Sequence, residues 1–323
     1  MLFESARGAV TIILRRGEIM VSTIVIASAG QLGSELMAAL KARGEAAVGV
    51  NLEQCNLDDP HSIEATLERH PGVTRIFNAG AFTQVDRAEH EPQAAFRTNA
   101  LGVGFLAHAC AERQITLVHF STDYVFGDGH HRPIEENDQP NPLSVYGRSK
   151  LLGERLALQH NPRTVVLRSC GLYGPSHPNF VRAMLRLGQG PEPVAIVNDQ
   201  IVTPTPARTL AEVAIALSTR DDFGIFHATA QGQCSWFDFA RALFDHLDLR
   251  PRLRPVDSAS WGAAARRPSY SVLENLELQR LQLDTFGDWY AELAAFLDAH
   301  GQRLLHELRP DDDLDAGHRP AAP

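Results

Sequence analysis

A tyrosine placed four residues before a lysine is the part of this sequence with the clearest chemistry. In a helix, Tyr146 and Lys150 would project from one face about one turn apart. A phenol has an ordinary pKa near ~10 and is a poor acid or base at neutral pH. An ammonium group beside it favours the phenolate and lowers that pKa, so the pair could transfer a proton near pH 7. Taken alone, such a pair is more often an exposed tyrosine and a solvated lysine, so the surrounding elements must decide.

Composition restricts the class of protein. The chain has 323 residues, of which 44% are hydrophobic and 21% charged, as in an ordinary soluble globular protein. Its net charge of -9 argues against a nucleic-acid partner, and no apolar run approaches the ~20 residues that span a bilayer. The cysteines are far apart and form no CxxC pair, which predicts a reduced, cytoplasmic compartment and no metal site. They are Cys55, Cys110, Cys170 and Cys234.

A glycine turn follows the first expected strand. Residues 23–27 form a β-branched run that predicts a buried strand, and residues 34–43 have the apolar spacing of a helix. Glycines between a strand and a helix let backbone N–H groups approach a pyrophosphate at the helix N-terminus. The candidate cofactor-binding residues at this turn are Gly30, Gln31, Leu32 and Gly33.

Two more expected strands, residues 46–50 and 75–81, add candidates for the same ligand. Asn51 stands where an acid would bind the ribose of NAD or a nearby arginine the phosphate of NADP, so NADH and NADPH both stay open, with a slight preference for NADH. Residues 56–58 could line an adenine pocket or form a solvated loop. Small residues after the third strand would let the chain pass close to a cofactor. These further candidates are Asn56, Leu57, Asn78, Ala79 and Gly80.

The strand expected at residues 116–120 leads into Ser121, Thr122, Asp123 and Tyr124, at the end of the sheet where α/β proteins bind ligands. A helix is expected over residues 89–111 with Asn99 near its middle, a long loop over 127–143, a helix over 146–159 and a strand over 164–168. This alternation predicts an α/β fold: a Rossmann-type, doubly wound parallel sheet.

The expected organisation has four parts. Residues 1–21 are an extension, expected to be disordered, and Met20 leaves open whether residues 1–19 are translated. Residues 22–170 form the dinucleotide-binding domain, with parts of 200–230 returning to it. Residues 171–300 form a smaller α/β substrate-binding region, with helices expected over 180–187, 207–218, 236–247 and 289–297. Residues 301–323 are polar and expected to be a disordered tail.

The order and spacing of several segments resemble the extended short-chain dehydrogenase/reductases, and within them the dTDP-4-dehydrorhamnose reductases. The similarity covers about residues 23–297, nearly the whole fold. The segments that carry it are 30–33 (GQLG), 78–89 (NAGAFTQVDRAE), 121–126 (STDYVF), 142–150 (PLSVYGRSK), 151–154 (LLGE), 199–200 (DQ), 204–205 (PT), 235–240 (SWFDFA) and 267–268 (RP).

The resemblance implies roles for particular residues. Tyr146 would donate a proton to a ketone oxygen as hydride arrives from NADPH or NADH. Lys150 would lower the tyrosine pKa and bind the nicotinamide ribose, and Asn99 would support the lysine. Thr122 would hydrogen-bond the ketone oxygen, with Ser121 as its alternative. The implied substrate-binding residues are Ser121, Thr122, Asp123, Tyr124, Gly171, Asn179 and Arg267, with Arg267 reaching a diphosphate or lying at the surface.

The function implied is reduction of the 4-keto group of a nucleotide-linked deoxysugar, for polysaccharide synthesis, in a protein that could be a homodimer. Two departures bear on it. Ala27 replaces the first glycine of the turn, which is tolerable if its backbone angles are ordinary. Gly171 replaces a tryptophan that would pack on the sugar, which leaves the exact sugar open. A sugar-nucleotide epimerase or dehydratase with tightly bound NAD is one alternative, and a non-catalytic regulatory subunit is another.

Overall fold

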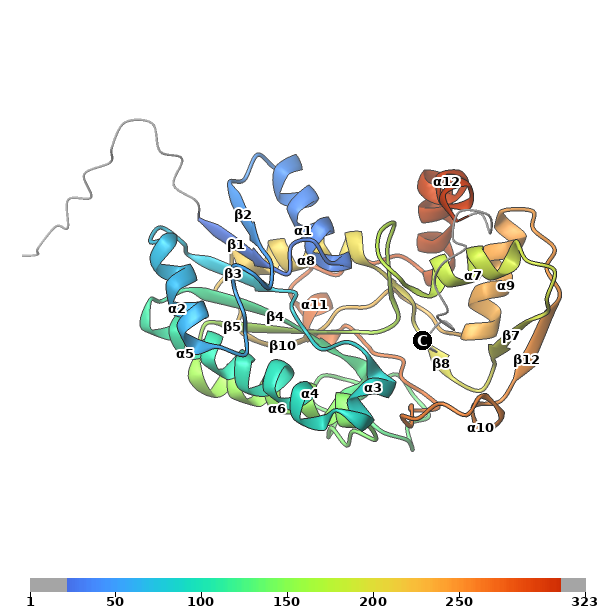
Figure 1. The fold of residues 1–323 in the computed structure, drawn as a ribbon, viewed down its shortest axis with the longest axis horizontal. Coiled ribbons are helices and arrows are strands. Elements are labelled where there is room, and N and C mark those ends of the chain that lie inside the picture. The colour runs from blue at the N-terminus through green and yellow to red at the C-terminus, as the bar shows by residue number, and fades with distance from the viewer. Residues whose placement is uncertain (1–21, 309–323) are drawn as a thin grey trace, which may run out of the picture.

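A computed structural model describes residues 22–308 of the chain (Figure 1). Its centre is a six-stranded sheet in the order β10-β5-β4-β3-β1-β2, in which every pair of neighbouring strands is parallel. The strands are β1 (Thr23–Ile26), β2 (Ala47–Val50), β3 (Arg75–Asn78), β4 (Thr116–Thr122), β5 (Thr164–Ser169) and β10 (Gly224–His227). This order, with crossings on both sides of β1, confirms the predicted doubly wound α/β fold.

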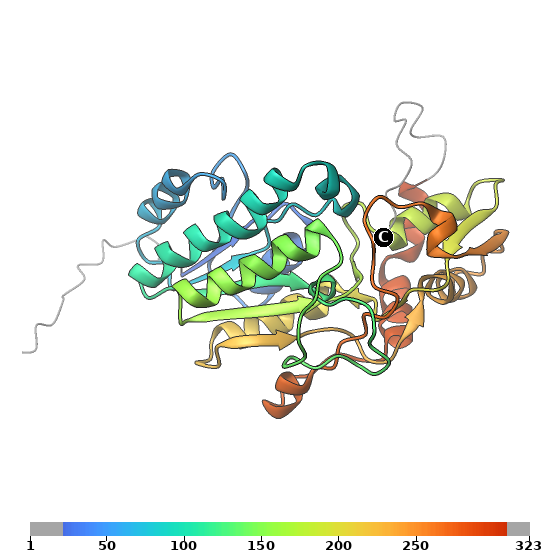
Figure 2. The same cartoon turned by 90° about the horizontal axis from the view of Figure 1, so that it is seen from below.

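Helices cover both faces of this sheet because its strands are apolar on both sides. Val25 and Phe77 pack in the core under α1 (Gln31–Ala42) and α8 (Ala207–Ser218), whereas Ile24 and Ile76 pack in the core on the opposite face. The second face is covered by α2 (Pro60–Arg69), α5 (Val103–Glu112) and α6 (Val145–His160). Figure 2 shows α5 and α6 lying side by side across it.

The single helix predicted over residues 89–111 is wrong. The segment is divided into α3 (Val85–His90), α4 (Pro92–Phe96), the π-helical turn η1 (Arg97–Gly102) and α5. Glu91 leaves helical geometry with φ -125°, because Pro92 clashes with a helical residue before it. A π-turn within a helix is a frequent mark of a functional position, and this one contains Asn99.

A smaller lobe lies at the carboxyl edge of the sheet, on the right of Figure 1. It has its own apolar core, formed largely by α7 (Phe180–Gly188), α9 (Trp236–His246) and α12 (Trp289–Glu307), with the strands β7 (Val194–Val197) and β12 (Leu253–Val256). The shorter elements are η2 (Asp123–Val125), β6 (Leu172–Tyr173), β8 (Ile201–Val202), β9 (Thr205–Pro206), β11 (Cys234–Ser235), α10 (Ser258–Trp261) and α11 (Leu276–Arg280).

The last helix corrects the expected boundary of the tail. α12 runs on to Glu307, and Leu304 is fully buried in the core of the smaller lobe, so residues 301–308 are ordered rather than a disordered tail. Leu293, Leu297 and Leu304 are spaced for one helical face, which gives the helix a reason to continue. The predictions for residues 1–21 and 309–323 lie outside the described residues.

The long loop predicted over residues 127–143 has neither helix nor strand, yet it is held at several points. Ile134 bridges to Leu273, and a Glu136 carboxylate oxygen accepts hydrogen bonds from the backbone N–H groups of His227 and Glu277. Asp128 accepts one from the Ser269 N–H. The loop therefore lies fixed between β10 and the segment 265–277.

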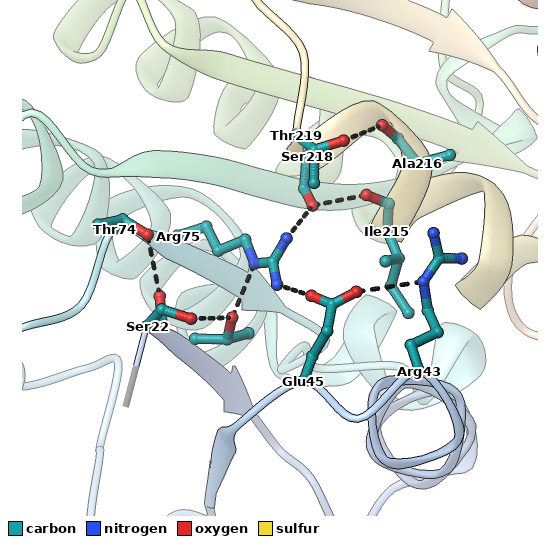
Figure 3. A network of polar contacts seen from close by, with 10 residues as sticks. Ser22, Arg43, Glu45, Thr74, Arg75, Ile215, Ala216, Ser218 and Thr219 are labelled. Carbon is teal, nitrogen blue, oxygen red and sulfur yellow. Dashed lines mark hydrogen bonds and ion pairs between the residues drawn. The ribbon is translucent and has the colours of Figure 1, made fainter. Parts of the chain in front are cut away.

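A buried arginine joins the elements at the amino edge of the sheet (Figure 3). Arg75 on β3 hydrogen-bonds Thr23 on β1 and Ser218 at the end of α8, and it pairs with Glu45 before β2. Glu45 also accepts from Arg43. This cluster is at the opposite edge of the sheet from the polar residues after β4, so its contribution is to stability rather than to chemistry.

Candidate active site

The turn between β1 and α1 has the geometry of a dinucleotide-binding site. The Gly30 N–H donates to the Ala27 carbonyl, and α1 begins without a side-chain cap or an acidic residue in its first turn. A Cβ at Gly33 would lie 2.1 Å from the Ala27 oxygen, so only glycine lets α1 start this close to the strand. The uncapped helix N-terminus fits the pyrophosphate of a nicotinamide dinucleotide.

Ala27 does not meet the condition expected of it. Its φ is +56°, in the left-handed region, where an L-residue other than glycine is strained by about 1–2 kcal/mol. The expectation of ordinary backbone angles is therefore wrong. The chain keeps the backbone conformation of the glycine turn, and Ala27 is the strained residue.

The other predicted cofactor residues have contacts of their own within the chain. The Asn51 side-chain oxygen accepts from the Ala29 N–H at 3.0 Å, which braces the glycine turn from the end of β2. Asn78 accepts from the Gly80 N–H, and Asn56 accepts from the Asp58 N–H. Leu32 and Leu57 are buried in the two cores, and Gln31 donates to the Leu172 carbonyl of the smaller lobe. Ala79 lies after β3, against the same core as Leu32.

Tyr146 lies in the first turn of α6, whose N-cap Ser144 accepts from the Gly147 N–H. A Cβ at Gly147 would lie 2.1 Å from the Tyr124 carbonyl oxygen, so this glycine lets α6 start directly against η2. The Tyr124 and Tyr146 rings meet edge to face, with their centroids 6.0 Å apart. The sequence analysis assigned no role to Gly147, although it lies inside the segment that carries the resemblance.

A buried carboxylate sits beside the tyrosine. Thr122 donates from its hydroxyl to Asp123 at 2.9 Å, and the Cys170 thiol donates to the other carboxylate oxygen. Burial raises the pKa of Asp123, while hydrogen bonds from Ser271, Cys170 and Thr122 oppose that rise. Cys170 and Ser271 were not predicted as site residues; no local signal marks Ser271, which reaches the site from the other lobe.

The expected lowering of the tyrosine pKa is not found. Burial and the neighbouring Asp123 charge raise the pKa of Tyr146 well above its usual value, and a hydrogen bond with Thr122 works in the opposite direction. The sequence places Lys150 on the same helical face, but its ammonium is directed elsewhere. It donates to the Phe120 carbonyl on β4 at 2.6 Å.

Lys150 is itself strongly affected by burial. The side chain is 2% exposed, and burial lowers its pKa from 10.5 to about 8, with the Glu154 charge opposing the change. Desolvation disfavours an ammonium group that has few hydrogen-bond acceptors around it. This lysine can therefore lose its proton close to neutral pH.

Asn99 is buried rather than exposed and acts on the segment beside the lysine. Its side chain accepts from the Phe82 N–H at 2.8 Å and donates to the Phe82 carbonyl and to Ser149, each at 3.0 Å. These bonds fix residues 79–84 against α6. None of these three bonds goes to Lys150, and the support expected for the lysine stays a prediction.

Ser121 faces away from Tyr146, which corrects its assignment as a substrate-binding residue. Its hydroxyl donates to Glu154, which forms a buried ion pair with Arg168 at 2.7 Å. β4 continues through Thr122, two residues beyond the predicted end, and successive residues of a strand point to opposite faces. Thr122 therefore faces the tyrosine and Ser121 cannot.

Arg267 is buried rather than at the surface. Its guanidinium forms a two-pronged ion pair with Asp86 at 3.0 and 3.2 Å, and it also hydrogen-bonds Tyr124. Although burial opposes it, hydrogen bonds from Arg267 and from the Ala265 backbone lower the pKa of Asp86. Asp86 was not predicted as a site residue, although it lies inside the resembling segment 78–89.

A cavity of about 390 Å³ lies beside Arg267, in the smaller lobe. Asp199 accepts from both the N–H and the hydroxyl of Ser258, and Gln200 donates to the same hydroxyl, so the two residues organise this loop. The charged and aromatic residues that line the cavity are Asp128, Asp199, Trp261, Arg266 and Arg267, and Gln200, Ser258 and Ser269 line it as well.

The two remaining predicted substrate residues have structural explanations. Gly171 has φ +55°, and a Cβ there would lie 3.0 Å from the Trp236 ring and 3.2 Å from Pro204, so no larger side chain fits without movement. Asn179 caps α7 by accepting from the Arg182 N–H and donates to the Gly174 carbonyl. Its amide is thus used by the backbone, and its assignment to the substrate stays a prediction.

Two kinds of feature are absent from the described part of the chain. Residues 22–308 contain no group of three or more His, Cys, Asp or Glu side chains that could hold a metal ion. Within the same range, no helix is both long and apolar enough to cross a membrane.

A glycine turn that opens the first helix of a parallel sheet, with a tyrosine, threonine and lysine beside the end of β4, defines an oxidoreductase of the short-chain dehydrogenase/reductase class. Sequence comparison identifies the family within this class. The chain belongs to the RmlD substrate binding domain family, whose model matches residues 21–301.

Similar proteins with known names support this family assignment. A dTDP-4-dehydrorhamnose reductase of Mycobacterium tuberculosis H37Rv is 37% identical over 283 residues, 85% of this chain and 92% of the relative. A dTDP-4-keto-6-deoxy-D-glucose reductase of Streptomyces niveus is 36% identical over 272 residues, 84% of this chain and 94% of the relative. The crystal structure of a dTDP-4-dehydrorhamnose reductase from Bacillus anthracis in complex with NADP superposes with a TM-score of 0.84 at 29% identity, covering 87% of this chain and 100% of that one.

Proposed function

We propose that this protein reduces the 4-keto group of a dTDP-linked 4-keto-6-deoxysugar with NADPH or NADH, and that Tyr146 is the proton donor. The observation that carries the proposal is the placement of Tyr146 against Thr122 and Asp123, beside the carboxyl end of β4. The names of the similar reductases supply the sugar nucleotide and the 4-keto group.

The cofactor supplies the hydride, and the chain holds and protonates the substrate. The backbone N–H groups at the start of α1 would hold the pyrophosphate, and Tyr146 would give its proton to the ketone oxygen. The raised pKa of Tyr146 keeps the phenol protonated at neutral pH, which is the form a reduction needs. An alkoxide is a much stronger base than a phenolate, so proton transfer to the substrate stays favourable.

Thr122 has a different part in this scheme from the one expected. Its hydroxyl donates to Asp123 and accepts from the Tyr124 N–H, and a hydrogen bond with Tyr146 holds the phenol beside it. The ketone oxygen would then depend mainly on Tyr146. A donor that is already oriented costs no reorganisation in the transition state.

The nucleotide part of the substrate would occupy the cavity beside Arg267. Arg267 links this cavity to the tyrosine, because it hydrogen-bonds Tyr124, whose ring packs on Tyr146. An arginine that stays charged in a partly buried wall suits a diphosphate. Which sugar is bound, the expected homodimer and the cytoplasmic location stay predictions.

The test is a single assay with matched variants. The purified protein is mixed with dTDP-4-keto-6-deoxysugars and NADPH or NADH, and nucleotide oxidation is followed by absorbance. We expect Tyr146→Phe to lower turnover by about 10²–10⁴-fold and to bind NADPH as the parent does. Tyr290→Phe, at an exposed tyrosine of α12, is the matched control and should keep the parent rate.

Three results would contradict the proposal. Reduction by Tyr146→Phe at the parent rate would remove the proton donor. Turnover without added NADPH or NADH, by protein that carries one bound NAD per chain, would instead indicate an epimerase or dehydratase. A chain that binds the sugar nucleotide but turns over none of the panel would indicate a regulatory subunit.

A further inference from the structure

A fully buried histidine lies beneath Lys150. His119 is in the middle of β4, is 0% exposed, and has no part in the chemistry described so far. Its Nδ1 lies 3.3 Å from the Asn78 side-chain nitrogen, and its Nε2 lies 3.5 Å from the Lys150 nitrogen. The histidine thus stands between the strand that leads to the cofactor loop and the lysine.

The protonation of this histidine follows from a backbone hydrogen bond. The Asn78 side-chain oxygen accepts from the Gly80 N–H at 3.1 Å, and a backbone N–H can only donate. The amide orientation is therefore fixed, and the NH₂ group of Asn78 faces His119. Because an NH₂ group is only a donor, Nδ1 must be the acceptor, and the ring proton of a neutral His119 must be on Nε2.

The Nε2–H is directed at Lys150. An ammonium group has three donors and no acceptor, so it gains nothing from a second N–H that faces it. A neutral amine has a lone pair that can accept from this N–H, while it still donates to the Phe120 carbonyl. We propose that His119 is a positioning residue for Lys150: its Nε2–H, fixed by Asn78 and Gly80, favours the neutral amine over the ammonium.

The charged groups around the lysine are compatible with this arrangement. Glu154, on the same helix, is the one acid whose charge favours the ammonium, and it is paired with Arg168 on β5 and bonded by Ser121 on β4. His119 stays neutral because burial and the Lys150 charge hold its pKa well below the usual value. The lysine therefore has a strong carbonyl acceptor on β4 and an N–H donor beside it.

This arrangement joins the lysine to the cofactor loop. The bonds run from the Gly80 N–H through Asn78 and His119 to Lys150, so a shift of residues 78–80 on cofactor binding would change which form of the lysine is favoured. The effect of this shift on turnover rests on the proposed function. The His119 tautomer and the Lys150 titration are independent of that function, because both can be measured without substrate.

The chain allows an unusually direct measurement because Lys41 and Lys150 are its only lysines. Protein labelled with ¹³C at the lysine ε-carbon gives two signals, and Lys41→Arg, at an exposed position of α1, leaves that of Lys150 alone. Titration of this signal gives the pKa of Lys150. ¹⁵N NMR of the histidine rings gives the tautomer of His119, identified by its loss in His119→Gln.

We expect the parent His119 to carry its proton on Nε2. In His119→Gln the flexible side chain can place its oxygen toward Lys150 and its NH₂ away from Asn78, so that the oxygen accepts from the ammonium. We then expect a pKa at least one unit higher, about tenfold in the proton-dissociation constant. His108→Gln, at an exposed histidine of α5, is the matched control and should leave the Lys150 titration unchanged.

A second variant provides the test if His119→Gln fails to fold. Asn78→Asp has nearly the same shape but offers only acceptors, so it should move the His119 proton to Nδ1 and let Nε2 accept from the ammonium. A parent proton on Nδ1 would overturn the proposal, and so would an unchanged Lys150 titration in the folded His119→Gln protein. If both measurements agree with the proposal while Tyr146→Phe retains activity, the proposed function fails and the positioning of Lys150 stands.

The kinetic arm separates positioning from a merely structural effect. In the folded His119→Gln protein we expect the alkaline limb of the profile of kcat/KM against pH to move upward together with the measured Lys150 titration. A loss of rate by the same factor at every pH would contradict the proposed link between His119 and the lysine proton.

Discussion

Burial of Lys150 makes the stability of the folded chain depend on pH above about 8. The pKa of this lysine is about 8 in the folded protein, because burial disfavours the ammonium, and its ordinary value is 10.5. Below pH 8 both states hold the proton, and the folded state bears the full cost of the buried charge. Between pH 8 and 10.5 the unfolded chain holds more protons than the folded one, so stability rises with pH.

The difference between those two pKa values sets the size of the effect. At 1.36 kcal/mol for each pKa unit, it corresponds to roughly 3 kcal/mol gained between pH 8 and 10.5. Lys150→Met keeps a similar length of side chain but has no titrating group. The bond to the Phe120 carbonyl is lost at every pH and therefore does not contribute to the change with pH.

The assay is urea unfolding of the parent and of Lys150→Met at several values between pH 7 and 10.5. The free energy of unfolding of the parent, minus that of the variant, should increase by about 3 kcal/mol over this range. Other groups that titrate there are common to both proteins, and their contributions cancel. If the two curves run parallel within about 0.5 kcal/mol, the lysine is not desolvated as its burial implies, and the reasoning fails.

Two further predictions concern the turn and the amino edge of the sheet. Ala27→Gly should remove left-handed strain and raise the free energy of unfolding in urea by about 0.5–1 kcal/mol. Its NADPH affinity should equal or exceed that of the parent, and a destabilised variant would mean that the alanine is not strained. Arg75→Met should lower the free energy of unfolding by about 3 kcal/mol, because it leaves Glu45 and Ser218 without their partner. The kcat should stay within twofold of the parent, and a large loss of kcat would show that this cluster is not merely structural.

The sequence was sufficient for the features that depend on local pattern. The β-branched run at residues 23–27, the glycine turn and the apolar spacing of α1 are encoded within about 20 residues, and the structure has them. The bounds predicted for α8 agree with the structure, and α9 begins at Trp236 as expected. Tyr146 and Lys150 share one helix for the same reason, since their spacing alone sets their face.

The sequence did not determine which groups the functional side chains contact. Lys150 turns toward a carbonyl on β4, and Arg267 meets Asp86 across 181 positions of the chain, neither of which a local pattern contains. The end of β4 was placed two residues early, which hid the opposite orientations of Ser121 and Thr122. The continuation of α12 is hidden by the polar composition after residue 301, although Leu304 keeps the apolar spacing of the helix.

The segment 265–277 has a consequence for attempts to change which sugar is bound. It comes from the smaller lobe, yet Ser271 hydrogen-bonds the Asp123 carboxylate and Leu273 bridges to the loop after β4. β10 likewise leaves that half of the sequence to complete the sheet beside β5. A chimera joined at residue 170 would therefore replace an edge strand and a partner of the buried acid together with the sugar pocket. Specificity in this scaffold is better transplanted as single positions around the cavity than as a domain.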